Sequence, residues 1–196
     1  MSKPDSTREV APRYIAPSRR LTYEDYCRLP SDQRYELMEG AIRVVPSPSV
    51  SHQEISKRIG TALISWIEGQ RLGKVYHAPL DVVLDQHNVV QPDLLYVSRQ
   101  RRGIITDPNI QGAPDLVVEI ISPATADWDR GKKRALYARF GTRELWLVDP
   151  ADRSIEVATL EDAKFRTTQV YHPGDTLASR LLPGFSLDVA GLFDRG

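Results

Sequence analysis

The clearest pattern of hydrophobic positions in the chain is a helical one. Between residues 51 and 70, apolar side chains recur every three or four positions, a spacing that places them along one stripe of a helix. Ser51 followed by Glu54 fits a capping box. The pattern therefore predicts a helix capped at Ser51, with a buried stripe of Ile55, Ile59, Ala62, Leu63 and Trp66.

Two further helices are predicted from capping signals. A short one lies within 21–30, where Thr22 is of a type that caps a first turn. The other runs to Phe140 and begins at Asp127 or Asp129.

Runs of β-branched and aromatic residues between turn signals predict strands. The expected strands lie at 34–39, 41–45, 113–122, 144–150, 154–160 and 165–171, with two more in 74–97 that meet in a turn at 86–88. The segment 98–112 reads as a polar loop with a basic run. Strands outnumber helices and alternate with them only in part, which indicates an α/β fold with a mixed central β-sheet, flanking helices and additional β-hairpins.

The domain organisation follows from polarity and length. Residues 1–20 are polar, contain proline and show no periodicity, so we expect a disordered or loosely attached arm. Residues 21–196 are long enough for one domain with a substantial core.

Composition limits the class of protein. Hydrophobic residues make up 41% of the 196 and charged residues 27%, as in ordinary globular proteins. No run of eighteen apolar residues is present, so we expect no membrane span, and the N-terminus lacks the apolar core of a secretory signal. A single cysteine, Cys27, excludes an intrachain disulfide and suits a reducing cytoplasm. The net charge of zero argues mildly against a protein that binds DNA in bulk, although it allows a local basic patch.

Candidate chemistry begins with Glu119, which stands within the apolar strand VVEIIS. A buried carboxylate without a partner is costly. Asp115 lies four residues earlier on the same strand, roughly 13 Å away, which is too far for the two to hold one ion. Asp93, after Pro92, lies on another strand. If these strands are neighbours, Asp93 and Glu119 can converge on one hard cation through oxygen ligands.

The helix that follows supplies a positive charge. Asp129, Lys133 and Tyr137 are spaced by four residues and share a face, whereas Lys132 lies about 100° around the helix. We expect Lys133 to point toward the carboxylates and Lys132 toward solvent or a DNA phosphate. Two carboxylates, a metal ion and a lysine form a group that suits phosphodiester cleavage.

Six segments carry a resemblance to a known family. In order they are YELMEG, SPSVSHQEI, QPDLLYV, GAPDLVVEIISP, DRGKKRALYARFG and ELWLVDP. Together they resemble the Uma-type restriction endonucleases, a branch of the PD-(D/E)XK nuclease superfamily, over residues 20–193. The resemblance implies a restriction-endonuclease-like core and cleavage of DNA that depends on Mg²⁺ (or Mn²⁺). It implies that Asp93 and Glu119 are the motif acids.

The sequence departs from the simplest superfamily pattern at one place. Ile121 stands where the lysine is expected, and Lys133 matches a position displaced to the next helix. The resemblance also points to Glu36 as a further acidic ligand and to His52 near the site. Tyr137 is a candidate for lining the site.

Three residues are candidates for contacting nucleic acid: Arg101, Arg102 and Lys132. Simpler interpretations stay open, because Asp115 and Asp129 can cap a strand and a helix, and the Arg101–Arg102 run can be a solvated loop. Lys132 stays open as the competitor of Lys133 for the active-site position.

The function that these observations predict is a metal-dependent nuclease, foremost a DNA endonuclease. The alternative is a non-catalytic module on the same fold that binds nucleic acid or a protein. A hydrolase acting on a nucleotide is a third reading, and a homodimer stays open.

Overall fold

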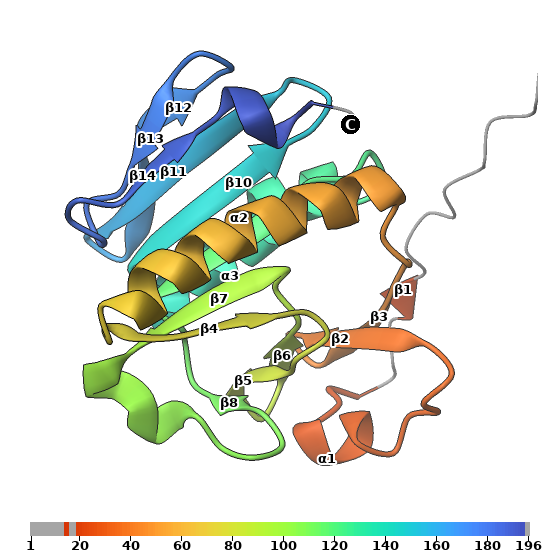
Figure 1. Ribbon diagram of the computed structural model, residues 1–196. Coiled ribbons are helices and arrows are strands. Elements are labelled where there is room, and N and C mark those ends of the chain that lie inside the picture. The colour runs from red at the N-terminus through yellow and green to blue at the C-terminus, as the bar shows by residue number, and fades with distance from the viewer. Residues whose placement is uncertain (1–13, 16–18, 195–196) are drawn as a thin grey trace, which may run out of the picture.

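A six-stranded main sheet lies at the centre of the computed structural model, which describes residues 14–15 and 19–194 (Figure 1). In spatial order its strands are β12 (Lys164–Tyr171), β11 (Ser154–Glu161), β10 (Glu144–Asp149), β9 (Leu116–Ile120), β7 (Leu94–Ser98) and β4 (Gly73–His77). Strands β9 and β10 run parallel, whereas the other neighbouring pairs are antiparallel. The sheet is therefore mixed, as predicted, and β11–β12 is the predicted closing hairpin.

A second six-stranded sheet is built mainly from the first half of the chain. Its strands, in spatial order, are β1 (Tyr14–Ile15), β3 (Ala41–Val45), β2 (Arg34–Met38), β6 (Asn88–Val90), β5 (Val82–Asp85) and β8 (Ile110–Gln111). The predicted β2–β3 hairpin turns at Gly40, whose φ is +80°. A Cβ atom at Gly40 would lie 2.7 Å from Cβ of Arg20, so only glycine fits this turn.

The prediction of two strands within 74–97 is wrong, because four strands form there. β4 and β5 replace the first predicted strand, and β6 and β7 replace the second. Pro79 and Pro92 lie at the two breaks. Proline has no N–H to donate to a strand ladder, so each predicted strand divides where proline stands. The break at Pro92 sends β6 into the second sheet and β7 into the main sheet.

Helix α2 (Val50–Gly69) covers one face of the main sheet (Figure 1). Its buried stripe includes Ile55, Ile59 and Leu63, as predicted. The N-cap is Ser49 rather than Ser51, because the Ser49 hydroxyl accepts the N–H of His52 at 3.2 Å. The helix therefore begins before the capping box that the sequence suggested.

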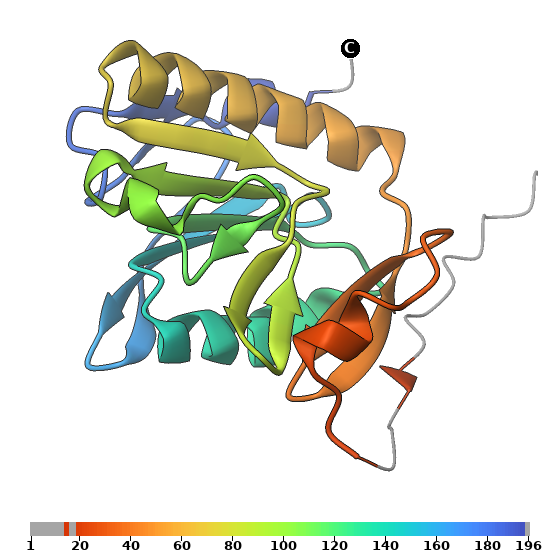
Figure 2. The ribbon, with the colours of Figure 1, turned by 90° about the horizontal axis from the view of Figure 1, so that it is seen from below.

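Helix α3 (Arg134–Phe140) covers the opposite face of the main sheet (Figure 2). It continues from a wide π-turn, η2 (Trp128–Lys133), in which the N–H of Arg134 donates to the carbonyl of Asp129. Alternate residues of β9 pack on the two helix-covered faces, so Val118 belongs to the core beneath α2 and Val117 to the core beneath α3. Glu119 follows the parity of Val117 and points to the α3 side.

Five short elements complete the described structure. Their bounds are α1 (Tyr23–Tyr26), η1 (Arg99–Ile104), β13 (Thr176–Ala178), β14 (Ser186–Asp188) and η3 (Ala190–Leu192). Thr22 caps α1 and forms the capping box with Asp25. Within the described ranges, no helix is both long and apolar enough to cross a membrane.

The predicted N-terminal arm lies largely outside the described residues, which omit 1–13 and 16–18. Of the residues in this arm, Tyr14 and Ile15 form β1 and pair with Arg43 and Ile42 of β3.

Candidate active site

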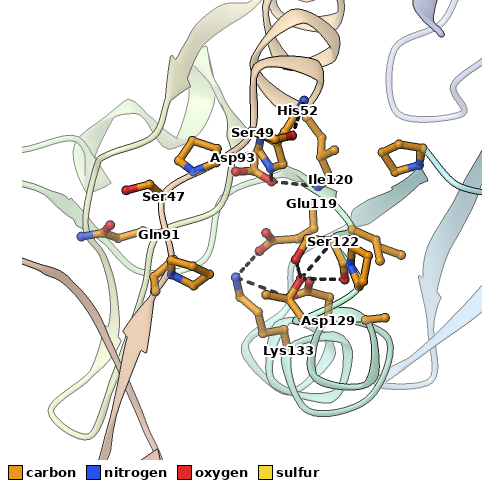
Figure 3. A pocket seen from close by; sticks show the side chains of 18 of the residues that line it. Ser47, Ser49, His52, Gln91, Asp93, Glu119, Ile120, Ser122, Asp129 and Lys133 are labelled. Atoms are coloured by element: carbon orange, nitrogen blue, oxygen red, sulfur yellow. Dashed lines mark hydrogen bonds and ion pairs between the residues drawn. The ribbon is translucent and has the colours of Figure 1, made fainter. Parts of the chain in front are cut away.

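A cavity of about 580 Å³ opens where the two sheets meet (Figure 3). The start of α2, the end of β9, the η2 turn and the β2–β3 hairpin all contribute to its lining. The polar side chains that reach it include Glu36, His52, Asp93, Glu119, Asp129 and Lys133. The cavity therefore collects acidic and basic groups from segments that are distant in the sequence.

Asp93 and Glu119 reach this cavity from neighbouring antiparallel strands. Leu94 of β7 pairs with Val118 of β9, so Asp93 and Glu119 occupy the next facing positions along the two chains. Oδ2 of Asp93 accepts the backbone N–H of Ile120 at 2.8 Å and lies 3.2 Å from Nε2 of His52. The Asp93 carboxylate is thereby fixed from two sides, and the strand adjacency assumed from the sequence is present.

Glu119 is buried at the base of the cavity, with 4% of the residue exposed. Its Oε1 lies 2.7 Å from Nζ of Lys133 and accepts the hydroxyl hydrogen of Tyr137 at 2.6 Å. Burial raises the pKa of Glu119 to about 8, against the opposing effect of Lys133. The nearby carboxylates of Asp129 and Asp93 raise this pKa further. The pKa of Glu119 therefore lies well above the ordinary range of a glutamate.

Lys133 points into the site, and Lys132 points away from it. Nζ of Lys133 lies 2.7 Å from Glu119, 2.9 Å from Glu36 and 3.9 Å from Asp129. Burial opposes the charged form, but the three carboxylates outweigh it and raise the pKa of Lys133 above its ordinary value. Lys132 is exposed, and its Nζ lies 4.5 Å from the ring centroid of Trp128. This is the orientation that the helical spacing predicted.

Glu36 enters the cavity from the second sheet. It is 1% exposed, and its Oε1 accepts the backbone N–H of Gln91 at 3.1 Å in addition to the Lys133 contact. Its Oε2 lies 3.5 Å from a guanidinium nitrogen of Arg43, which is itself buried. Glu36 therefore has a cation at each of its two oxygens.

The structure also places three residues whose roles were left open by the sequence: Tyr137, Asp115 and Asp129. Tyr137 is fully buried behind Glu119 and does not line the cavity. The Asp115 carboxylate accepts the N–H of Ser98, the last residue of the neighbouring strand β7, at 2.8 Å and lies close to Arg101 and Arg143. The prediction that Asp129 caps a helix is wrong.

Asp129 is the site residue that the sequence reasoning did not assign. It is 4% exposed and lines the cavity, while Asp127 holds the N-cap position without a side-chain hydrogen bond. Burial raises the pKa of Asp129 above its ordinary value. Its position four residues before Lys133 was the available signal.

Arg101 and Arg102 lie away from this cavity. They belong to η1, which follows the end of β7, whereas Asp93 precedes its beginning. Five strand residues, roughly 16 Å, separate the two ends. Their contact with nucleic acid stays a prediction, and it requires a ligand that reaches the far end of β7.

The donor set at the cavity suits a hard divalent cation in part. Within the described ranges, no cluster of three or more His, Cys, Asp and Glu side chains has the arrangement of a metal site. The ammonium group of Lys133 instead lies among Glu36, Glu119 and Asp129. Asp93 and Glu119 still supply carboxylate oxygens, the donors that Mg²⁺ and Mn²⁺ prefer. The buried Nδ1 of His52 has no hydrogen-bond partner among the described residues. The imidazole beside Asp93 thus has one nitrogen with no protein partner there.

Comparisons with known proteins relate the chain to proteins of similar sequence or fold. The family model Uma2, described as "Putative restriction endonuclease", matches residues 22–190. An uncharacterized protein of Synechocystis sp., slr1290, is 29% identical over 132 residues, which are 63% of this chain and 65% of that protein. The match thus spans about two thirds of the relative's length. A crystal structure of a putative nuclease belonging to DUF820 from Anabaena variabilis superposes with a TM-score of 0.74 at 22% identity, over 88% of this chain and 97% of that one. This likeness supports the mixed α/β fold.

Proposed function

The chain belongs to the Uma2 family of putative restriction endonucleases, and from this premise we propose that it is a metal-dependent endonuclease that hydrolyses phosphodiester bonds in DNA. The observation that carries the proposal is one juxtaposition. Asp93 and Glu119 face each other across β7 and β9, and the ammonium group of Lys133 lies 2.7 Å from Glu119 at the same cavity.

Asp93 and Glu119 would hold the Mg²⁺ or Mn²⁺ ion, with the backbone carbonyl of Ile120 as a third oxygen donor. Both contacts of Glu119 described above fall on Oε1, so Oε2 is the oxygen that can serve the cation. A bound Mg²⁺ lowers the pKa of water and stabilises the charge that develops on a phosphate. The N–H of Ile120 and the ring of His52 keep the Asp93 carboxylate in place for this role.

Lys133 provides the fixed positive charge of the site. It is buried, so its attraction to a phosphate oxygen is screened less than at a surface. The ammonium group can orient the attacking water or neutralise charge on the phosphate, a preorganised contribution worth about 10²–10³ in rate. Glu119, Glu36 and Asp129 raise the pKa of Lys133, so this residue acts as a charge rather than as a base.

DNA is the proposed substrate because the family carries the name of restriction endonucleases. Arg34 and Arg43 add positive charge to the cavity lining, where a phosphate would enter. Lys132, exposed next to the site on the η2 turn, can contact a neighbouring phosphate. The positive charge available to a phosphate is thus local, since the whole chain carries a formal net charge of zero.

The proposal is tested by a substrate panel of supercoiled plasmid, single-stranded DNA, RNA and mononucleotides, each with Mg²⁺, Mn²⁺ or EDTA. We expect cleavage of DNA with either metal and none with EDTA. The non-catalytic alternative predicts nucleic-acid or protein binding without cleavage in any condition. Activity confined to mononucleotides would replace the endonuclease by a nucleotide hydrolase.

A further inference from the structure

The flexible side chain of Lys133 is held in place in part by a residue of the second sheet. The lysine lies on a helical turn rather than on the strand that carries Glu119. Lysine has a long side chain with several rotatable bonds, so its ammonium group needs other groups to fix it. Its nearest carboxylate partner is Glu119, at 2.7 Å. A cation on Glu119 would weaken that contact, because two positive charges would then share one carboxylate.

Two other carboxylates lie near the ammonium group, and they differ in strength of contact. Glu36 lies 2.9 Å from Nζ of Lys133, within hydrogen-bond distance, whereas Asp129 lies at 3.9 Å. At 3.9 Å, Asp129 attracts the ammonium group electrostatically but is too far away to accept a hydrogen bond from it. Glu36 is therefore the partner that can still set the position of the amine after Glu119 has turned to a metal ion.

Glu36 itself is fixed from the second sheet. Glu36 lies on strand β2, and its Oε1 accepts the backbone N–H of Gln91 at 3.1 Å. Arg43 of the neighbouring strand β3 lies against Oε2 at 3.5 Å, and its guanidinium carbon lies 4.8 Å from the ring centroid of Trp128. With Lys133 at one oxygen and Arg43 at the other, a divalent cation at Glu36 would meet two positive charges. This favours a role for Glu36 toward the two cations rather than toward a metal ion.

We propose that Glu36 is a positioning residue, which holds the ammonium group of Lys133 in the cavity when a metal ion occupies Asp93 and Glu119. The second sheet is then part of the catalytic apparatus, because it supplies the group that compensates for a lysine displaced from the strand. This inference rests on the proposed nuclease function for its catalytic consequence. The contact of Glu36 with Lys133 does not depend on that function, and neither does the role of Glu36 outside the metal site.

The test uses the full chain and reads Lys133 directly. An amine-acylating reagent is applied with and without Mg²⁺, and labelling of Lys133 is quantified by mass spectrometry. Glu36→Gln should increase labelling of Lys133 severalfold in Mg²⁺, while the Mg²⁺ Kd measured by calorimetry stays within about threefold of wild type. Lys132, which is exposed and does not line this cavity, is the internal control, and its labelling in the same samples should not change between wild type and Glu36→Gln. In a cleavage assay, Glu36→Gln should lower kcat by about 10- to 100-fold with little change in KM.

Two results would overturn the proposal. A rise of the Mg²⁺ Kd by about tenfold or more, with unchanged labelling of Lys133, would make Glu36 a metal ligand. Unchanged labelling with unchanged Kd would leave Glu36 with a structural role only. Glu36→Asp keeps the charge and shortens its reach by one methylene, so it should give an intermediate rise in labelling, and it carries the test if Glu36→Gln does not fold. A wild-type protein that cleaves no DNA would defeat the proposed function while the labelling experiment still decides this inference.

Discussion

Replacing Lys133 by methionine perturbs the charge balance of the site with little change in side-chain volume. The ammonium group lies within 4 Å of carboxylates of Glu119, Glu36 and Asp129, and all four residues are buried. Removing one partner of a buried ion pair costs about 3–5 kcal/mol, because the other charge is left without compensation. In a domain of this length, 1 kcal/mol corresponds to about 2–4 °C in Tm, so we expect a loss of roughly 6–20 °C at pH 8.5.

The cost should depend on pH in a defined direction. The pKa of Glu119 is about 8 in the folded chain with Lys133 present, against about 4.3 for an unfolded glutamate. A carboxyl with a raised folded pKa keeps its proton in the native state after the unfolded chain has lost it, so its contribution to stability falls as pH rises through that interval. Without Lys133 this pKa rises further. At pH 6, below the pKa of about 8, Glu119 already carries its proton in the wild type, so less attraction to Lys133 is lost and the destabilisation should be clearly smaller than at pH 8.5.

Urea unfolding followed by circular dichroism measures the loss of unfolding free energy at pH 6 and at pH 8.5. A thermal melt at pH 8.5 measures the change in Tm. Lys132→Met is the matched control, because the neighbouring lysine is exposed and its contact with Trp128 is worth about 1 kcal/mol or less. A loss in Lys133→Met below about 1 kcal/mol at pH 8.5, or an equal loss at the two pH values, would refute the described charge balance.

Three further outcomes are expected. Mg²⁺ affinity measured by calorimetry should rise between pH 6 and 8 and level off above pH 8, because the cation displaces a proton from Glu119 below its pKa of about 8; a flat profile would contradict this. Lys133→Ala should reduce the cleavage rate by about 10² or more, whereas Lys132→Ala should mainly weaken DNA binding in a salt-dependent way; equal loss of rate in both would remove the distinction. Tyr137→Phe removes the hydroxyl that donates to Glu119 and should cost about 1–3 kcal/mol in urea unfolding; a neutral effect would show that Glu119 does not need this donor.

Local patterns in the sequence predicted the elements that position the site. The apolar stripe of α2 and the hairpin at Gly40 follow from periodicity and turn chemistry within a few residues. Glu119 stood out because a charge within an apolar strand requires a buried partner. The spacing of four residues placed Lys133 and Tyr137 on one face, and both contact Glu119. These inferences needed only helix and strand geometry.

Other features could not be predicted because they depend on contacts between distant segments. Strands of three to five residues, such as β5 and β6, are too short to show a period, so the division of 74–97 into four strands was missed. The wide η2 turn has no sequence signature, and it brings Asp129 into the cavity instead of leaving it as a cap. The contact of Glu36 with Lys133 joins the second sheet to the η2 turn, and the order of strands in the sequence does not fix which sheet each strand enters.

The measurement that tests the central claim most directly is Mg²⁺-dependent nicking of supercoiled plasmid by wild type and by Asp93→Asn, which keeps the shape of the side chain and removes its charge. The account predicts that wild type converts plasmid to nicked or linear forms with Mg²⁺ and not with EDTA, and that Asp93→Asn, folded to the same Tm within a few degrees, shows no cleavage above background. Cleavage by Asp93→Asn at the wild-type rate, or by wild type in EDTA, would contradict a metal-dependent site at Asp93 and Glu119.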